Sequence, residues 1–106
     1  MDIGKLRHRL ELQKPIVGQD EYGEQYTRWE TYAIVWASLE PLQGRELVNA
    51  QQTNSEINYK ITIRYNELVK VTHRGLLDKN FYEINFINDP ELKHEYQELM
   101  CKCVSL

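Results

Sequence analysis

The sequence predicts an all-β protein, mainly antiparallel, that forms a small β-barrel or sandwich with a long loop or short helix between strands 2 and 3. Short alternating segments recur at spacings typical of small barrels, and polar turn residues separate them. Two strongly apolar segments, 29–42 and 57–65, also flank one polar segment, 43–55. With 106 residues, 42% of them hydrophobic, the chain is expected to form a single domain over 1–106.

The first expected strand covers Leu6–Gln13, where Leu10 and Leu12 alternate with polar and charged side chains. The region that follows, Ile16–Thr27, contains two glycines and several acidic and amide residues with little periodicity. This composition predicts an exposed loop.

The second expected strand, Trp29–Leu42, is apolar at both odd and even positions. Such a pattern predicts a central strand covered on both faces. Pro41 cannot donate a ladder hydrogen bond, so regular pairing is expected to stop there. A polar segment of about thirteen residues begins at Gln43, and within it Gly44 and the following RELVNAQQ can form one or two helical turns.

The third expected strand has the clearest alternation in the chain. One face would carry Ile57, Tyr59, Ile61, Ile63 and Tyr65, and the other face would be polar. A slip of one residue would expose all five side chains, so the strand register is expected to be strongly fixed.

The remaining segments predict more short strands. After a turn at Asn66–Glu67, the alternation of Leu68–Arg74 predicts a strand. A polar turn at Asp78–Asn80 then leads into FYEINFI, and the two segments are expected to form a hairpin. In FYEINFI the shared face would hold Tyr82, Ile84 and Phe86.

The segment Tyr96–Val104 fits two structures. Strand alternation groups Leu99, Cys101 and Cys103, whereas helical spacing groups Tyr96, Leu99, Met100 and Cys103. The preceding short strands favour a strand, because a last strand can close the sheet.

Charge and hydropathy exclude several classes of protein. The net charge is −3 and the Lys and Arg residues are scattered, which argues against a general nucleic-acid binder. No segment approaches the roughly 20 apolar residues of a membrane span, and the N-terminus is too charged for a signal-peptide core. The chain is therefore expected to be made and kept in the cytoplasm, without membrane contact.

No constellation of residues predicts catalysis, a cofactor or a metal site. Ser38 and Ser55 lack a G-x-S-x-G setting, and phosphate-binding glycine loops are absent from the sequence. Cys101 and Cys103 lie two apart on an expected strand, so they are interpreted as reduced thiols. The histidines His8, His73 and His94 show no zinc-type spacing to them. The acidic pairs Asp20–Glu21 and Glu95 with Glu98 are interpreted as solvated surface.

Short signals along nearly the whole chain resemble one family. They are Gly4 to Arg9; Asp20 to Glu24; Trp29; Val35 to Ala37; Leu42 to Glu46; Ile61 to Tyr65; Phe81 to Ile84; and Asn88 to Pro90 followed by a strand-like tail. In this order and at this chain length, the sequence resembles the head-tail joining, or head closure, proteins of long-tailed bacteriophages and prophages.

The resemblance implies a structural virion protein with a small β-barrel fold and no enzyme activity. It implies a ring, expected to be a dodecamer, beneath the portal and adaptor proteins, which closes the DNA-filled head, gates DNA exit and receives the tail proteins. Double-stranded DNA would pass through the channel without sequence-specific binding. The chain would assemble in the host bacterial cytoplasm and end in the connector, or neck, of the virion.

The resemblance also implies that the polar segment faces the channel. The channel-loop residues under this hypothesis are Gln43, Gly44, Arg45, Glu46, Leu47, Val48, Asn49, Ala50, Gln51, Gln52, Thr53, Asn54 and Ser55. Their only charges, Arg45 and Glu46, cancel, so the loop is poorly suited to gripping phosphate. Fully extended, it would project roughly 20 Å and return. The alternative is that this segment is a disordered tip without a function.

The hypothetical subunit and portal contacts are Arg7, Arg9, Arg45, Glu46 and Arg64. The competing function is a free-standing small-barrel binding module for a peptide or nucleic acid. A monomer that binds oligonucleotides and ignores portal-adaptor complexes would favour that alternative.

Overall fold

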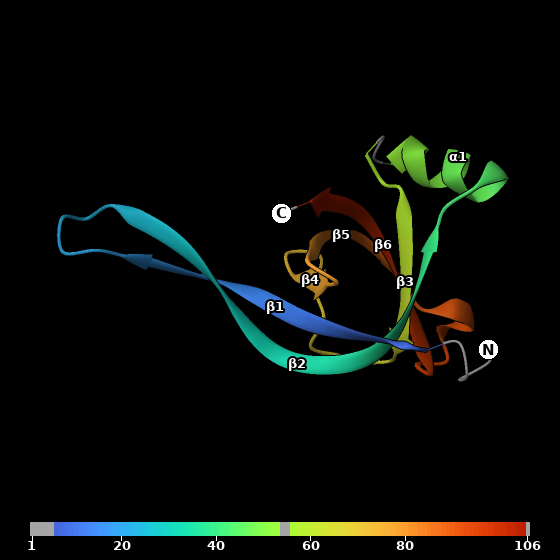
Figure 1. The fold of residues 1–106 in the computed structure, drawn as a ribbon, viewed down its shortest axis with the longest axis horizontal. Coiled ribbons are helices and arrows are strands. Elements are labelled where there is room, and N and C mark those ends of the chain that lie inside the picture. Colours follow the sequence, from blue (N-terminus) through green and yellow to red (C-terminus); the bar gives the residue numbers. More distant parts are fainter. Residues whose placement is uncertain (1–5, 54–55, 106) are drawn as a thin grey trace.

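The computed structural model describes residues 6–53 and 56–105. Six antiparallel strands form a closed barrel in the order β1-β2-β3-β6-β5-β4 (Figure 1). The strands are β1 (His8–Gln19), β2 (Gln25–Pro41), β3 (Tyr59–Arg64), β4 (Arg74–Leu77), β5 (Asn80–Asn88) and β6 (Tyr96–Ser105). Helix α1 (Gly44–Thr53) connects β2 to β3, and the 3₁₀ helix η2 (Pro90–Leu92) precedes β6. The predicted all-β class is confirmed, with a short helix between strands 2 and 3.

Alternating side chains from the strands fill the barrel. The most deeply buried of them, each at most 1% exposed, are Leu10, Leu12, Ala37, Ile61, Ile63, Leu99 and Cys101. Complete burial of one such side chain contributes about 1.5–3 kcal/mol. The predicted register of the third strand is confirmed at Ile61 and Ile63, but Tyr65 follows the strand and is 36% exposed.

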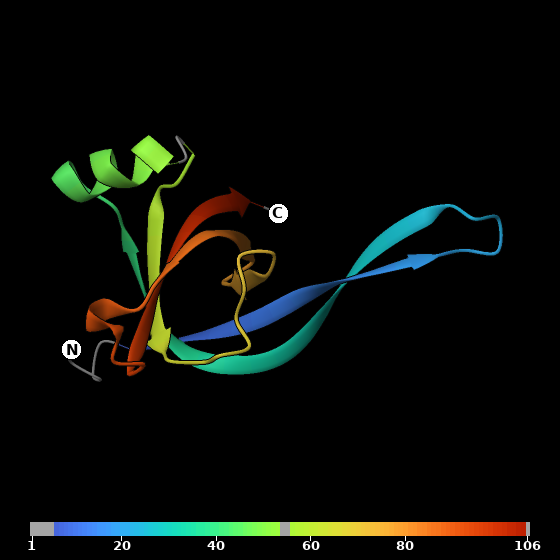
Figure 2. The same ribbon diagram turned by 180° about the vertical axis from the view of Figure 1, so that it is seen from behind.

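Strands β1 and β2 continue beyond the barrel as a two-stranded ribbon, which we call the arm (residues 13–31; Figures 1 and 2). The arm begins at the pair Gln13 and Thr31. Gln13 is also the last residue of β1 that pairs with β4, because β4 pairs with Glu11–Gln13 only. The predicted loop Ile16–Thr27 is therefore wrong. Only residues 20–24 form a turn, and the rest of that segment is strand without a buried face.

A β-bulge marks the junction between the barrel and the arm. Leu12 pairs with Ala33, whereas the next residue, Gln13, pairs with Thr31, so Tyr32 is the extra residue of β2. Bulges of this kind bend a strand and increase its twist. The arm consequently leaves the barrel as a separate, twisted element (Figure 2).

The prediction that Trp29–Leu42 is covered on both faces is wrong. Ile34 and Trp36 are each 52% exposed, and the buried residues of β2 are Ala37 and Ser38. A barrel strand turns only one face inward. The apolar residues on the other face of β2 therefore lie on the surface.

A second bulge changes the expected face of β5. Ile84 pairs with Cys101 and Phe86 with Met100, the very next position of β6, so Asn85 is the extra residue. Tyr82 and Ile84 are buried as predicted, but Phe86 is 47% exposed. The expected sharing of one face by all three is wrong because the bulge reverses the alternation.

The strand predicted at Leu68–Arg74 is also wrong. Most of this segment forms turns, although Val69 still reaches the core, and β4 begins only at Arg74. The predicted hairpin is present between β4 and β5. Its two turn residues, Asp78 and Lys79, have φ angles of 50° and 70°, as the twist of a two-residue hairpin turn requires. The final segment is a strand, as the chain context favoured.

Candidate functional site

Helix α1 contains most of the proposed channel-loop residues. Gln43 precedes the helix, residues 44–53 form it, and Asn54 and Ser55 lie outside the described residues. Gly44 has a φ of 59°, a conformation that favours glycine at the point where the chain leaves β2. The helix lies at the end of the barrel where β2 ends and β3 begins (Figure 1). The segment expected to act as a loop is thus a short, positioned helix.

An ion pair holds α1 to the barrel. Lys60 Nζ lies 2.8 Å from Glu46 Oε1 and 3.6 Å from Glu98 Oε2, and its side chain is only 16% exposed. Burial lowers the pKa of Lys60, but the hydrogen bond to Glu46 and the charge of Glu98 outweigh this, so the pKa lies above its ordinary value. Gln51 adds a hydrogen bond from Nε2 to the carbonyl of Ile57, at 3.3 Å. Sequence reasoning missed Lys60 because it belongs to the polar face of its strand.

Packing beneath α1 is incomplete. A cavity of about 190 Å³ separates the helix from the barrel and is lined by Glu46, Asn49, Ala50, Ile57, Phe86 and Met100. The helix presents the narrow apolar stripe that its sequence predicts, and Val48 is 57% exposed. Few interactions therefore hold α1 in place.

The tip of the arm (residues 20–24) is ordered by its own hydrogen bonds. Backbone N–H groups of Tyr22 and Glu24 each donate to Asp20 Oδ1 at 2.9 Å. Gly23, with a φ of 82°, supplies the left-handed conformation that the turn requires. Tyr22 is 84% exposed. The tip thus presents a tyrosine among carboxylates on a defined backbone.

Side chains at the root of the arm fix its direction. The guanidinium of Arg74 lies 4.2 Å from the ring centre of Trp29 and 3.7 Å from that of Phe81. Its Nε also donates to Gln13 Oε1 at 2.8 Å. We call these four residues the Arg74 clamp.

A second polar contact lies beside the clamp. The Tyr32 hydroxyl and His73 Nδ1 are 2.7 Å apart. Burial, together with the charges of Lys70 and Lys14, lowers the pKa of His73. The two groups share a hydrogen bond whose direction depends on the tautomer of His73.

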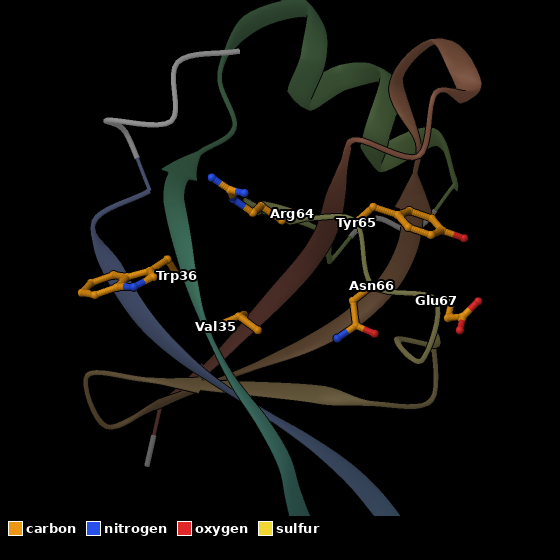
Figure 3. A pocket seen from close by; sticks show the side chains of 6 residues that line it. All are labelled: Val35, Trp36, Arg64, Tyr65, Asn66 and Glu67. Carbon is orange, nitrogen blue, oxygen red and sulfur yellow. The ribbon is translucent and has the colours of Figure 1, made fainter.

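An open pocket of about 530 Å³, which we call the Trp36 pocket, lies at the barrel end away from α1. Val35, Trp36, Arg64, Tyr65, Asn66 and Glu67 line it. Trp36 and Arg64 stand on one side and Tyr65 and Glu67 on the other (Figure 3). Outside this lining, the Arg9 guanidinium lies 4.7 Å from the ring centre of Trp36.

The five hypothetical contact residues fall into two groups. Arg64 lines the Trp36 pocket, Arg9 stacks on the Trp36 ring, and the exposed Arg7 precedes β1 near that end. Arg45 and Glu46 lie in α1 at the start of β3, whereas Arg64 ends that strand. The structure therefore does not bring all five together.

Other chemistry has little support. No three potential metal ligands cluster among residues 6–53 and 56–105. Cys101 and Cys103 are free thiols, and burial raises the pKa of the Cys101 thiol, which keeps it protonated and unreactive. None of the helices in the described ranges is long and apolar enough to cross a membrane.

Comparisons with known proteins agree with this geometry. The family model described as "Phage head completion protein" matches residues 1–104. A protein of Shigella flexneri 2a solved in solution is 24% identical, with a TM-score of 0.79 over 96% of each chain. A chain from the virion of a native gene transfer agent particle is 14% identical, with a TM-score of 0.64 over 95% of this chain and 97% of that one. Both structures share the fold. No curated protein sequence matches the chain significantly.

Proposed function

The chain belongs to the phage head completion protein family and is a structural component of the virion head-tail connector; from this premise we propose that it forms a ring beneath the portal and its adaptor. The ring closes the DNA-filled head, gates DNA exit and offers a docking surface to the tail. Assembly takes place in the host bacterial cytoplasm, and the ring then stays in the neck of the virion.

The observation that carries this proposal is the arm. An isolated two-stranded hairpin is marginal in water, yet the arm extends the molecule to 49 Å along one axis, against 27 Å along the others. It also exposes Val17, Tyr22 and Tyr26. A monomeric binding module has no need of such an element, whereas a subunit of an assembly can cover it with neighbouring chains.

Helix α1 is the proposed gate. Glu46 is paired with Lys60, so Arg45 is the one charge of the helix that could act on DNA, and the other exposed groups are mostly amides. Each cation in contact with phosphate strengthens binding. A surface with one cation per subunit therefore obstructs DNA without holding it tightly. The reach of the segment is also shorter than an extended loop would give, because ten helical residues span about 15 Å.

The test of ring formation is to add the purified chain to portal-bearing heads and image the complexes. A ring at the portal is the expected result. A stable monomer that binds oligonucleotides and leaves portal-bearing heads unoccupied would contradict the proposal and favour the binding module.

The test of gating is deletion of residues 46–53. The barrel should still fold, because its core side chains lie outside α1, but filled heads carrying the variant should leak DNA. A second variant, Glu46→Gln, weakens the anchoring of α1 without removing the helix and should leak less DNA than the deletion. Heads that retain their DNA with the deletion variant would rule out α1 as the gate.

A further inference from the structure

The arm tip and the Trp36 pocket have complementary chemistry. Between Pro15 and Thr27 the chain carries Asp20, Glu21 and Glu24 and no Lys or Arg. Arg64 lines the pocket and Arg9 stacks on the ring of the lining residue Trp36, while Glu67 is the one acidic residue in the lining that the structure describes.

The pocket also has room for an aromatic side chain. Its volume of about 530 Å³ lies within the range of small-ligand sites, and the aromatic residues Trp36 and Tyr65 line opposite sides of it (Figure 3). Arg64 is exposed and forms no ion pair with any residue that the structure describes. Tyr22, which is 84% exposed on an ordered turn, is an anchor of the type that dominates protein interfaces.

The two surfaces cannot meet within one chain. The tip lies at one end of the long axis, whereas the start of β1, which pairs with Trp36, lies toward the other end (Figures 1 and 2). Because the surfaces differ, contact between copies is heterologous: each copy offers one tip and one pocket. Contacts of this type close into rings when the rotation between copies permits.

We infer that the arm tip of one subunit docks into the Trp36 pocket of the next copy of this chain, with Tyr22 in the pocket and Glu21 and Glu24 facing Arg9 and Arg64. The inference rests on the proposed ring. It names the contact that joins neighbouring subunits.

The test is charge reversal on either side of the contact, followed by measurement of the copies retained on portal-bearing heads. One variant reverses the tip (Glu21→Lys with Glu24→Lys), another the pocket (Arg9→Glu with Arg64→Glu), and a third combines all four changes. Each of the first two should reduce the retained copies about tenfold or more, because like charges across an interface oppose association. The combined variant should recover at least about half of the wild-type level, since both signs are exchanged.

The combined variant also controls for folding, and all four positions are exposed. Wild-type retention by the tip or the pocket variant would overturn the inference and leave the proposed ring intact. Loss in both without recovery in a folded combined variant would overturn it too, and would indicate that these surfaces contact another virion protein. Failure of the wild-type chain to occupy heads would instead overturn the proposed function, and the inference with it.

Discussion

The same two strands behave differently in the barrel and in the arm. In the barrel, β1 and β2 have an inward face and further partners, so Leu10, Leu12 and Ala37 are completely buried. In the arm they pair only with each other, and residues 21–31 are all exposed. The barrel is thus stabilised by side-chain burial, whereas the arm depends on its turn, its ladder and the clamp at its root.

The largest expected difference in stability is between shortening one side chain in the barrel and shortening one in the arm. Leu12→Ala should lower the free energy of unfolding by about 2–5 kcal/mol, because it leaves a cavity in the core. Val17→Ala in the arm should change it by about 0.5 kcal/mol or less, because Val17 is 64% exposed. Urea denaturation measures both values. Similar losses would mean that the arm is packed as tightly as the barrel.

Two glycines allow a closer comparison, because a Cβ at either position would lie 2.6 Å from a neighbouring side chain. At Gly75 the neighbour is Leu10, which is fully buried and cannot move aside. Gly75→Ala should therefore destabilise the fold by about 1–3 kcal/mol. At Gly18 the neighbour is the ring of Tyr26, which is 48% exposed.

The Tyr26 ring can rotate into solvent. Gly18→Ala should therefore change the free energy of unfolding by about 0.5 kcal/mol or less. Thermal unfolding of the two variants side by side is the measurement. An equally large loss at Gly18 would show that Tyr26 is held in place and that the arm is more rigid than its exposure suggests.

Removal of the Arg74 clamp should loosen the arm more than the barrel. Arg74→Ala abolishes two cation–π contacts and the hydrogen bond to Gln13, at a cost of about 1–2 kcal/mol. Amide hydrogen exchange should accelerate in residues 13–31 and change little in β3 and β6. Arg28→Ala, an exposed arginine of the arm outside the clamp, is the control. Equal acceleration in both variants would exclude the clamp as the determinant.

The smallest expected effect is a pH dependence near the arm root. A histidine whose pKa is lower in the folded chain favours folding above its ordinary value of 6.5, and this contribution is lost as the pH falls through the folded value. Stability should therefore decrease as the pH falls below about 6.5, and His73→Gln should reduce that decrease. If the free energy of unfolding of the variant falls with pH as steeply as that of the wild type, other groups cause the acid sensitivity.

The parts of the fold that the sequence predicts are the strands whose apolar side chains alternate with polar ones. Ile61 and Ile63 define β3 by alternation, and the polar run after Pro41 is correctly associated with a short helix. The arm could not be predicted in this way, because both of its faces are exposed and no period of two results. A hairpin signal did exist in the tight turn around Gly23, between residues with strand propensity. The exposed Phe86 was missed because alternation cannot reveal a bulge.

In the candidate site, too, some features could be predicted from the sequence and others could not. The segment 43–55 stands out in the sequence because it is polar between two apolar strands, and Arg9 and Arg64 were selected as exposed charges. That each of them lies near Trp36 depends on strand register, which brings together residues far apart in the chain. The carboxylates of the tip gave no sign of a partner, since isolated acidic residues in a polar segment usually face solvent.

The bulge after Leu12 has a consequence for how such chains can diverge. It separates the register of the arm from that of the barrel, so residues can be inserted or removed in matched pairs on both strands without moving any core side chain. Each added pair on each strand would lengthen the arm by about 6.6 Å. Span can therefore vary among descendants, or be set by an engineer, while the barrel sequence stays constant.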